Sequence, residues 1–409
     1  MDITVVVPTY NRAPLLDRTL SSLGHQTLAA EAYEVVVGDD GSTDDTADVV
    51  ARHARHYRVD RLWQEDLGFR AARARNIAAE RGTGRILVFV DSGVVAPPEF
   101  LAAHLAAHGA PEEPDKVVLG YQFGYDKHNP ENLITAAEID EDPGVLAARL
   151  RAEKRCLDMR EPNFQQVDDD LGGLAAPWIH FWTANVSVPA AAFHAVGRFD
   201  ETFVGWGGED IDLGYRLRRA GLPFVLSRDA AAIELPHPRN RERDVKTHQR
   251  NFERIIRRYG DPLLELNGVV RARVLHDRLA ELTDALAARR AAGLDHDDGE
   301  PFPDGRVLLV GADTATGRQV ERCVEPDPVV AGRVEAAGTP VTVGWGMRTG
   351  LDPGQVDRCL LADSLGRHYP AWAVEHLVEH TRSIAGEVLW WPSGRPAVPH
   401  TADVEASGC

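Results

Sequence analysis

Cysteine is scarce in this sequence of 409 residues, which contains Cys156, Cys323, Cys359 and Cys409 and no others. These residues are far apart and form no Cys-x-x-Cys pair or other metal-ligand spacing, which argues against both a disulfide framework and a cysteine-based metal site. We therefore expect reduced thiols in a cytoplasmic protein, with Cys409 exposed to solvent.

Long apolar runs and an excess of positive charge are missing as well. No run reaches the length that spans a membrane, and a strand is expected from Ile3 onward, so we expect neither a signal peptide nor a membrane anchor. The formal net charge of -18 argues against nucleic acid or an anionic membrane as a partner, because most of the surface would repel a polyanion. A small anion in a local basic pocket is still compatible with this charge.

The composition is that of an ordinary globular protein, 44% hydrophobic and 26% charged, and the chain is long enough for two domains. Its first part alternates strand and helix patterns, which predicts a parallel sheet of the α/β class. The expected strands are 3–7, 34–38, 61–64 and 85–90, and the expected helices are 14–23, 43–55 and 71–80.

Polar residues follow three of these strands: Pro8, Thr9 and Asn11, then Asp39 and Asp40, and then Asp91. Because the carboxyl ends of strands in an open α/β sheet line one crevice, we expect these residues to converge on a ligand, and a nucleotide is the natural candidate. A strand-end aspartate can accept hydrogen bonds from a base or a ribose. Taken alone, the acidic turn at Asp39 and Asp40 fits ordinary turn chemistry equally well.

A second candidate site is the segment 205–210, Gly-Trp-Gly-Gly-Glu-Asp, at the start of a helix expected to run to Arg219. The glycines leave room for a bulky ligand, and Trp206 offers an apolar face on which a sugar ring can stack. Glu209 and Asp210 would then be placed to deprotonate an acceptor hydroxyl. The alternative is that these first-turn acids only complement the helix dipole.

Together with 7–12 (Val-Pro-Thr-Tyr-Asn-Arg), these motifs resemble family 2 glycosyltransferases of the GT-A fold. Between residues 3 and 237 the chain is especially similar to bacterial glycosaminoglycan polymerases and polypeptide N-acetylgalactosaminyltransferases. The further segments that carry this resemblance are 68–70, 74–76, 89–93, 181–188, 197–201 and 214–217. We expect a Rossmann-like nucleotide-binding sheet with an acceptor subdomain.

The resemblance implies a role for each motif residue. Thr9, Asp39 and Arg75 would contact the uridine of a UDP-sugar, Arg75 or Arg70 would face the diphosphate, and Asp210, with Glu209 beside it, would be the base. The expected donor-binding set is Pro8, Thr9, Asn11, Asp39, Asp40, Arg70, Arg75, Asp91 and Ser92. Retaining relatives carry Glu-Asn where this chain has Glu209-Asp210, so the resemblance implies inversion at the anomeric carbon.

The chain departs from the family pattern at the fourth strand end, where relatives present Asp-x-Asp and this sequence has Asp91-Ser92-Gly93. A hard cation would still find oxygen ligands in Asp91, the Ser92 hydroxyl, the diphosphate and water. By resemblance to the polymerases, His237 completes the site, although a histidine between two prolines is otherwise more often structural. We expect Mg²⁺ or Mn²⁺, bound more weakly than in relatives.

The acceptor side is less clearly marked. We expect Trp182, Trp206, His180 and Asp158 to lie around the acceptor, with Asp158 near the end of a helix predicted over 143–159. An ordinary packed or exposed histidine is the alternative for His180. The acidic run 168–170 is either a solvated loop or a holder for a cationic or polyhydroxylated acceptor.

Three regions are expected: a catalytic domain at 1–243, a helical segment and acidic linker at 244–304, and a small α/β accessory domain at 305–409. Leu275, Leu279, Leu282 and Leu286 form an apolar stripe for docking on the catalytic domain or on a second subunit, in a possible homo-oligomer through the helix at 270–290. Residues 310–313, 325–327 and 361–364 faintly resemble an S-adenosylmethionine-dependent methyltransferase, and we expect a degenerate, non-catalytic form of it.

The sequence therefore predicts an inverting glycosyltransferase that moves a sugar, with UDP-glucose as the best candidate donor, to a hydroxyl of a soluble small molecule. By resemblance, the acceptor is an aminocyclitol such as validoxylamine. The alternatives are a polysaccharide-building glycosyltransferase and a nucleotide-sugar-binding module without catalysis.

Overall fold

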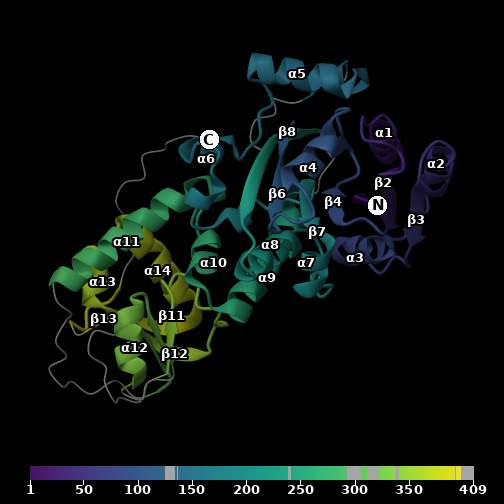
Figure 1. The fold of residues 1–409 in the computed structure, drawn as a ribbon. Coiled ribbons are helices and arrows are strands. Elements are labelled where there is room, and N and C mark those ends of the chain that lie inside the picture. The colour runs from purple at the N-terminus through teal and green to yellow at the C-terminus, as the bar shows by residue number, and fades with distance from the viewer. Residues whose placement is uncertain are drawn as a thin grey trace. The chain divides into compact units, whose positions relative to one another are not determined.

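The computed structural model describes residues 1–124, 134–135, 137–237, 241–292, 305–311, 320, 322–336, 340–391 and 393–397. The chain divides into two compact units, Met1–Asn251 and Phe252–Cys409 (Figure 1). Most of the predicted linker, together with Asp313 and Cys409, lies outside the described residues. Each unit is built on its own β-sheet.

The first unit contains an eight-stranded sheet with the order β3-β2-β1-β4-β7-β6-β8-β5. The four strands predicted near the N-terminus form its parallel part: β1 (Ile3–Thr9), β2 (Tyr33–Asp39), β3 (Val59–Trp63) and β4 (Ile86–Val90). The other part is formed by β5 (Val94–Val95), β6 (Val117–Phe123), β7 (Asn185–Pro189) and β8 (Phe224–Glu234). Because β7 runs antiparallel to both β4 and β6, its first residue lies beside the carboxyl end of β4.

Helices cover both faces of this sheet. One core combines alternate valines of β1 and β2 with apolar residues of α1 (Ala13–Leu23), α2 (Thr46–His53) and α4 (Phe100–His108). On the other face, α3 (Ala71–Arg81) lies so close to β2 that a Cβ at Gly38 would stand 2.1 Å from the carbonyl oxygen of Ala74. The helices thus bury the sheet and leave its strand ends to form a site.

The acceptor part of the first unit follows β6. Its helices are η1 (Glu138–Asp140), α5 (Pro143–Glu153), α6 (Glu161–Gln166), η2 (Leu171–Gly173), η3 (Pro177–His180), α7 (Ala190–Ala195), α8 (Glu209–Arg219) and the start of α9 (Arg241–Tyr259). The helix predicted over 143–159 ends at Glu153 because Lys154 adopts a left-handed backbone conformation, with φ 52°. Asp158 therefore lies in a loop, and not on that helix.

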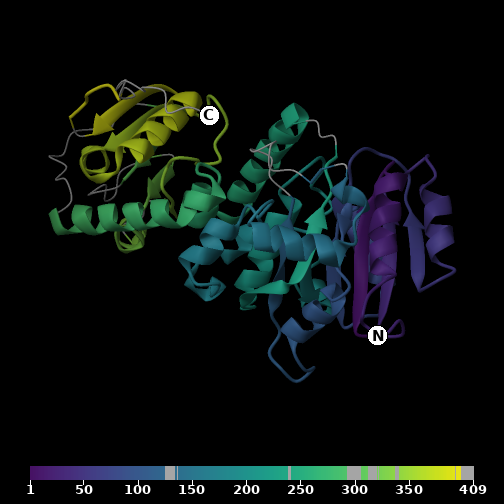
Figure 2. The same cartoon turned by 90° about the horizontal axis from the view of Figure 1, so that it is seen from above.

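The second unit contains a five-stranded parallel sheet with the order β11-β10-β9-β12-β13. Its strands are β9 (Val307–Val310), β10 (Arg322–Glu325), β11 (Val341–Val343), β12 (Val356–Ala362) and β13 (Ala385–Trp391). Its helices are α10 (Pro262–Asn267), η4 (Ala272–Val274), α11 (Leu275–Ala292), α12 (Pro328–Ala336), α13 (Asp363–His368) and α14 (Ala371–Ile384). Figure 2 shows α11, in green, as a long helix beside the yellow elements of this unit.

Most of the leucine stripe of α11 is buried inside the second unit. Leu275, Leu282 and Leu286 are buried there, and α11 packs against α13. The helical segment predicted over 244–304 is thus divided: the start of α9 belongs to the first unit, while α10 and α11 belong to the second. Contacts within the unit therefore cover three of the four leucines that were expected to meet the catalytic domain or a second subunit.

Two simpler expectations concern the surface and the thiols. Cys156, Cys323 and Cys359 are buried, and none of them forms a disulfide with another described residue. Among the helices in the described ranges, none combines the length and the apolar character needed to span a bilayer.

Candidate active site

The polar residues after β1, β2 and β4 lie at one edge of the first sheet, and the structure brings the start of α8 to the same place. The contact is made by Arg75 of α3, whose Nη2 donates to Asp91 Oδ1 at 2.9 Å and whose Nη1 donates to Glu209 Oε1 at 3.1 Å. Two segments separated by more than a hundred residues thus share one cation. The predicted donor side and the predicted base lie in a common site.

Arg75 is buried, with 4% of its surface exposed, and its guanidinium lies 5.6 Å from the centre of the Phe199 ring. Burial lowers the pKa of Arg75, but the neighbouring carboxylates of Asp91 and Glu209 outweigh this effect and raise its pKa above the ordinary value. A permanent positive charge therefore stands at the strand ends, where it can neutralise charge on a departing anion.

Asp210 has the properties of a general base. Its side chain is partly exposed, yet protein surrounds most of it, and this burial together with the charge of Glu209 raises the pKa of Asp210 to about 7. The backbone N–H of Ile211 and the cation of Arg75 act in the opposite direction. A base with a pKa near neutral accepts a proton efficiently at physiological pH.

Glu209 has a different environment from its neighbour. It is buried, its Oε1 accepts from Arg75, and its Oε2 has no hydrogen-bond partner among the described residues. A carboxylate held in this way orients Arg75 and raises the pKa of Asp210, while Asp210 keeps the access to solvent that an acceptor needs. The two neighbouring acids thus differ in their surroundings: Glu209 is buried against Arg75, and Asp210 is partly open to solvent.

Asp39 is fully buried at the end of β2. Its Oδ2 accepts from Arg61 at 2.6 Å, and its Oδ1 accepts from the backbone N–H of Ser42 at 2.8 Å. Sequence reasoning missed Arg61 because nothing in the pattern of β3 distinguishes it from a surface residue. The pair fixes the carboxylate at the place where a nucleotide base is expected.

The next acid, Asp40, is hydrogen-bonded to the segment that follows β3. It accepts hydrogen bonds from Gln64 Nε2 and, at 2.6 Å, from the backbone N–H of Arg70, and burial raises its pKa. The side chain of Arg70 donates to the carbonyl of Glu65. In this arrangement Asp40 shapes the loop that carries Arg70.

The residues after β1 divide into a lining group and a bracing group. Thr9 is buried, and its hydroxyl has no partner among the described residues, so it is free to bond a ligand. Asn11 instead braces the turn after β2, since its backbone N–H donates to Ser42 Oγ and its Oδ1 accepts from the N–H of Thr43. Pro8 accepts a hydrogen bond from the hydroxyl of Ser92 through its carbonyl oxygen.

His237 lies near the turn that follows β4. The backbone N–H of Leu235 donates to the carbonyl of Gly93 at 2.9 Å, and Val94 pairs with Glu234. The ring Nδ1 of His237 stands 3.2 Å from the carbonyl oxygen of Leu235. Across the described ranges, no group of three histidine, cysteine or acidic side chains is placed to hold a metal ion.

On the acceptor side, the two tryptophans are partly exposed. Trp206 belongs to the glycine-rich loop before α8, and its ring lies 5.7 Å from the ring of His248. Trp182 stacks against the guanidinium of Arg160 at 4.7 Å. Both tryptophans retain the exposure that stacking against a sugar requires.

Asp158 and His180 lie in the interior. Arg160 pairs with Asp158 at 2.7 Å and donates to the backbone carbonyl of His180 at 2.8 Å. Both predicted acceptor residues are almost completely buried, with exposures of 2% and 1%. Asp158 is paired with Arg160 inside the protein, and neither residue has the exposed surface that contact with an acceptor requires.

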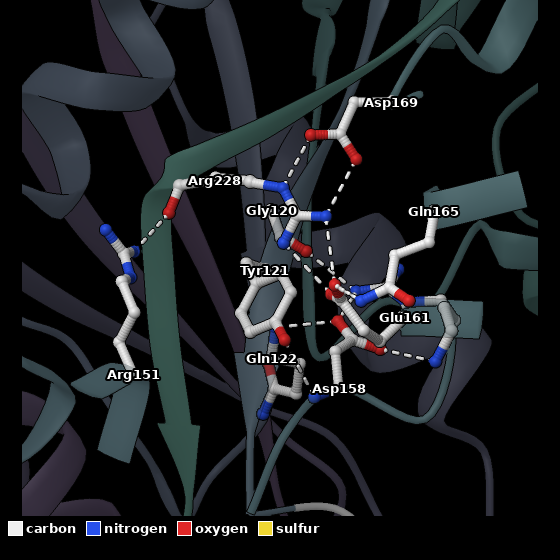
Figure 3. Close-up of polar contacts among 10 residues, drawn as sticks. Gly120, Tyr121, Gln122, Arg151, Asp158, Glu161, Gln165, Asp169 and Arg228 are labelled. Atoms are coloured by element: carbon white, nitrogen blue, oxygen red, sulfur yellow. Dashed lines mark hydrogen bonds and ion pairs between the residues drawn. The ribbon is translucent and has the colours of Figure 1, made fainter. Parts of the chain in front are cut away.

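The acidic run 168–170 anchors the acceptor region. Figure 3 shows Asp169 and Glu161 on either side of the Arg228 guanidinium, which they contact at 2.6 and 2.9 Å. Arg228 lies where β8 slips its register against β6, and the side chain of Asp170 accepts from the N–H of Gly172. At least two of the three acids therefore stabilise local structure.

The second unit has its own strand-end crevice, at the carboxyl end of β10. Glu325 is buried there and pairs with Arg289 of α11 at 2.7 Å, while Arg289 Nε donates to Ser364 Oγ at 2.9 Å. An acid in this position of a parallel α/β sheet can bind a nucleotide ribose. Here the chain supplies its own cation instead.

The order of the first sheet, the acids at its strand ends and the two acids at the start of α8 are those expected of a glycosyltransferase of the GT-A fold. Residues 4–150 match the family described as Glycosyl transferase family 2, and residues 172–237 match the N-terminal domain of galactosyltransferase. The first unit therefore contains a glycosyltransferase family 2 domain. The predicted α/β sheet and the family 2 resemblance of this unit are confirmed.

Several named relatives share this unit. A validoxylamine A glucosyltransferase of Streptomyces hygroscopicus subsp. jinggangensis is 48% identical over 264 residues, which cover 64% of this chain and 62% of that protein. The uncharacterized glycosyltransferase YfnE of Bacillus subtilis is 32% identical, with 59% of this chain and 66% of that protein covered. Chondroitin synthase of Pasteurella multocida is 28% identical, with coverages of 59% and 26%. The chain spans about three fifths of the length of the validoxylamine A glucosyltransferases that it matches.

The occupied crevice of the second unit leads to a prediction about the methyltransferase resemblance. We expect the full-length protein to show no saturable binding of S-adenosylmethionine in isothermal titration calorimetry, because Arg289 already neutralises Glu325. The same sample should bind UDP, which serves as a control for folding. A saturable S-adenosylmethionine signal would show that the crevice opens.

Proposed function

We propose that this protein is an inverting glycosyltransferase that moves glucose from UDP-glucose to a hydroxyl of a soluble aminocyclitol. The observation that carries the proposal is the single cation, Arg75, shared by Asp91 on the donor side and Glu209 on the acceptor side. Asp210 stands next to this bridge with partial exposure and a raised pKa. A direct displacement at an anomeric carbon needs a base for the acceptor hydroxyl and positive charge for the leaving group within one site.

In the proposed reaction, an acceptor oxygen attacks the anomeric carbon while Asp210 takes the proton from that oxygen. The bond from the anomeric carbon to the diphosphate oxygen breaks, and its electron pair leaves with UDP. Arg75 neutralises the developing charge on the diphosphate. One displacement, with the base and the leaving group on opposite sides of the sugar, inverts the configuration.

The donor and the acceptor are proposed from the validoxylamine A glucosyltransferases, which share close to half of the aligned residues. Thr9 and Asp39 would hold the uridine, and Trp182 and Trp206 would flank the sugar or the acceptor. A cationic aminocyclitol also suits a site whose acids outnumber its single central arginine.

A divalent cation fits the site only together with the donor. Asp91 presents a carboxylate with 41% of its side chain exposed, and His237 lies near the same turn. A magnesium or manganese ion takes its remaining ligands from phosphate and water when the protein supplies few. When bound there, such an ion would add positive charge at the diphosphate.

Metal removal tests this part of the proposal. We expect excess chelator to lower transfer strongly and added Mg²⁺ or Mn²⁺ to restore it. Asp91 is the only acid in the Asp91-Ser92-Gly93 segment, so the ion should be bound weakly and a chelator should remove it readily. A further check is that Asp91→Asn should raise the Mg²⁺ or Mn²⁺ concentration needed for half-maximal transfer. Full transfer in excess chelator would assign the leaving-group charge to Arg75 alone.

The raised pKa of Asp210 gives an expected pH dependence. The base works only when deprotonated, so kcat/KM should fall about tenfold per pH unit below the pKa of about 7 and level off above it. The measurement is a profile of kcat/KM at constant ionic strength. A limb near pH 4, the ordinary range for a carboxyl group, would mean that Asp210 is not the titrating base.

The experiment that tests the function is a screen of nucleotide sugars for slow hydrolysis by the pure protein, followed by transfer to aminocyclitols. We expect UDP-glucose to be turned over and a single product sugar to be added. Repeated addition to a growing chain would favour the polysaccharide-building alternative. Binding of a nucleotide sugar without hydrolysis or transfer would favour the binding module.

A further inference from the structure

The loop at 204–208 carries Trp206 and leads directly into Glu209 and Asp210. Three of its residues, Gly205, Gly207 and Gly208, have left-handed φ angles of 88°, 87° and 99°. Glycine has more backbone freedom than any other residue, so a segment built in this way does not hold one conformation by itself. Another part of the protein must fix it if Trp206 and Asp210 are to keep a defined geometry.

The first half of α9 supplies these contacts. Asn251 Nδ2 donates to the carbonyl of Gly207 at 2.8 Å in a buried environment. Thr247 Oγ1 lies 3.1 Å from the carbonyl oxygen of Trp206 and shares its hydroxyl hydrogen between this acceptor and the carbonyls of Arg243 and Asp244 on its own helix. Arg250 Nη2 donates to the carbonyl of Val204 at 3.2 Å. Three side chains within about one turn of α9 thus offer hydrogen bonds to three carbonyl groups of one loop.

Helix α9 also packs closely against the loop. A Cβ at Gly205 would stand 2.8 Å from the methyl carbon of Thr247, and a Cβ at Gly207 would stand 2.6 Å from His248 Nδ1. The ring of His248 also lies beside the ring of Trp206. The glycines are therefore needed for the approach of α9 as well as for the turns of the loop.

We propose that Thr247 and Asn251 are positioning residues for glycosyl transfer. They hold the carbonyl groups of Trp206 and Gly207, which belong to the peptide groups before and after Gly207. In this way they fix the stacking face of Trp206 and the direction from which Asp210 meets the acceptor. This inference rests on the proposed function. It assigns a role in the active site to a helix that the sequence pattern placed outside the catalytic domain.

The first test uses substitutions that change one contact at a time. Thr247→Val removes the hydroxyl and keeps the side-chain shape, Thr247→Ser keeps the hydroxyl, and Asn251→Ala removes the amide. We expect Thr247→Val and Asn251→Ala to lower kcat/KM for the acceptor by about tenfold or more, with the donor KM changed less than about threefold. Thr247→Ser should keep most of the wild-type kcat/KM for the acceptor.

Lys246→Ala is the matched control, because Lys246 lies on the same helix, is exposed and pairs with Glu242 of that helix. It should leave both constants unchanged. Wild-type acceptor kinetics in both Thr247→Val and Asn251→Ala would overturn the proposal. So would an equal loss for donor and acceptor, since that result indicates general damage to the fold.

Hydrogen–deuterium exchange tests the same contacts without any reaction. The peptide that contains residues 204–208 should exchange faster in Thr247→Val and Asn251→Ala than in the wild type or Lys246→Ala. Unchanged exchange would overturn the proposal even if the enzyme is active. A faster exchange in a protein that transfers no sugar would instead support the role of α9 and refute the proposed function.

Discussion

Replacing Asp210 with asparagine is expected to lower turnover by about two orders of magnitude or more, because the amide cannot take the acceptor proton. The fold should tolerate the change, since the shape of the side chain is kept and the backbone N–H of Ile211 can still bond the amide oxygen. Donor binding should persist. The measurements are kcat with saturating substrates and the Kd for UDP.

Two further variants make this result specific to Asp210. Asp48→Asn makes the same chemical change on an exposed face of α2 and should leave turnover at the wild-type level. The residual activity of Asp210→Asn should also lose the pH limb expected in the wild type. Turnover near the wild-type value in Asp210→Asn would exclude this residue as the base.

Replacing Arg75 with methionine has the second large expected effect. Loss of a charge aimed at the leaving group should lower kcat by about two to three orders of magnitude. The same change leaves Glu209 buried without a cation, and breaking a buried pair in this way costs about 3 to 5 kcal/mol of folding stability. The single variant therefore combines a chemical loss with a structural one.

The double variant Arg75→Met/Glu209→Gln separates the two effects. Removing the buried charge of Glu209 should recover most of the thermal stability but none of the turnover. Arg73→Met, on the same helix, removes a cation whose partner Glu201 is partly exposed, and it should change neither. Recovery of turnover in the double variant would mean that Arg75 acts only by keeping the fold intact.

Local signals were sufficient to predict the elements that carry the donor side. The strand at Ile3 and the acidic turn after Asp39 depend on alternation and turn chemistry within a few residues, and both lie where the sequence places them. Likewise, α3 begins at Ala71 and ends at Arg81, where the sequence predicts a helix over 71–80. Such features need no knowledge of the rest of the chain.

The contacts of the site that could not be predicted from the sequence join different segments of the chain. The partnership of Arg61 with Asp39 joins two neighbouring strands, and the platform of Phe199 under Arg75 joins α3 to a segment more than a hundred residues away. For Asp158 the sequence offered a carboxylate near aromatic residues, but only the folded chain shows that Arg160 encloses it. Pattern analysis shows which residues can react, whereas burial decides which of them a substrate can reach.

The internal pairing of Arg289 with Glu325 affects where this protein can be divided. The acidic stretch after α11 looks like a natural place to cut, yet a fragment that ends there would keep the arginine and lose its carboxylate partner. The matching C-terminal fragment would contain a buried glutamate without its counter-ion. Limited proteolysis at that stretch should therefore yield two pieces that remain associated, and separate expression should yield pieces that fold poorly.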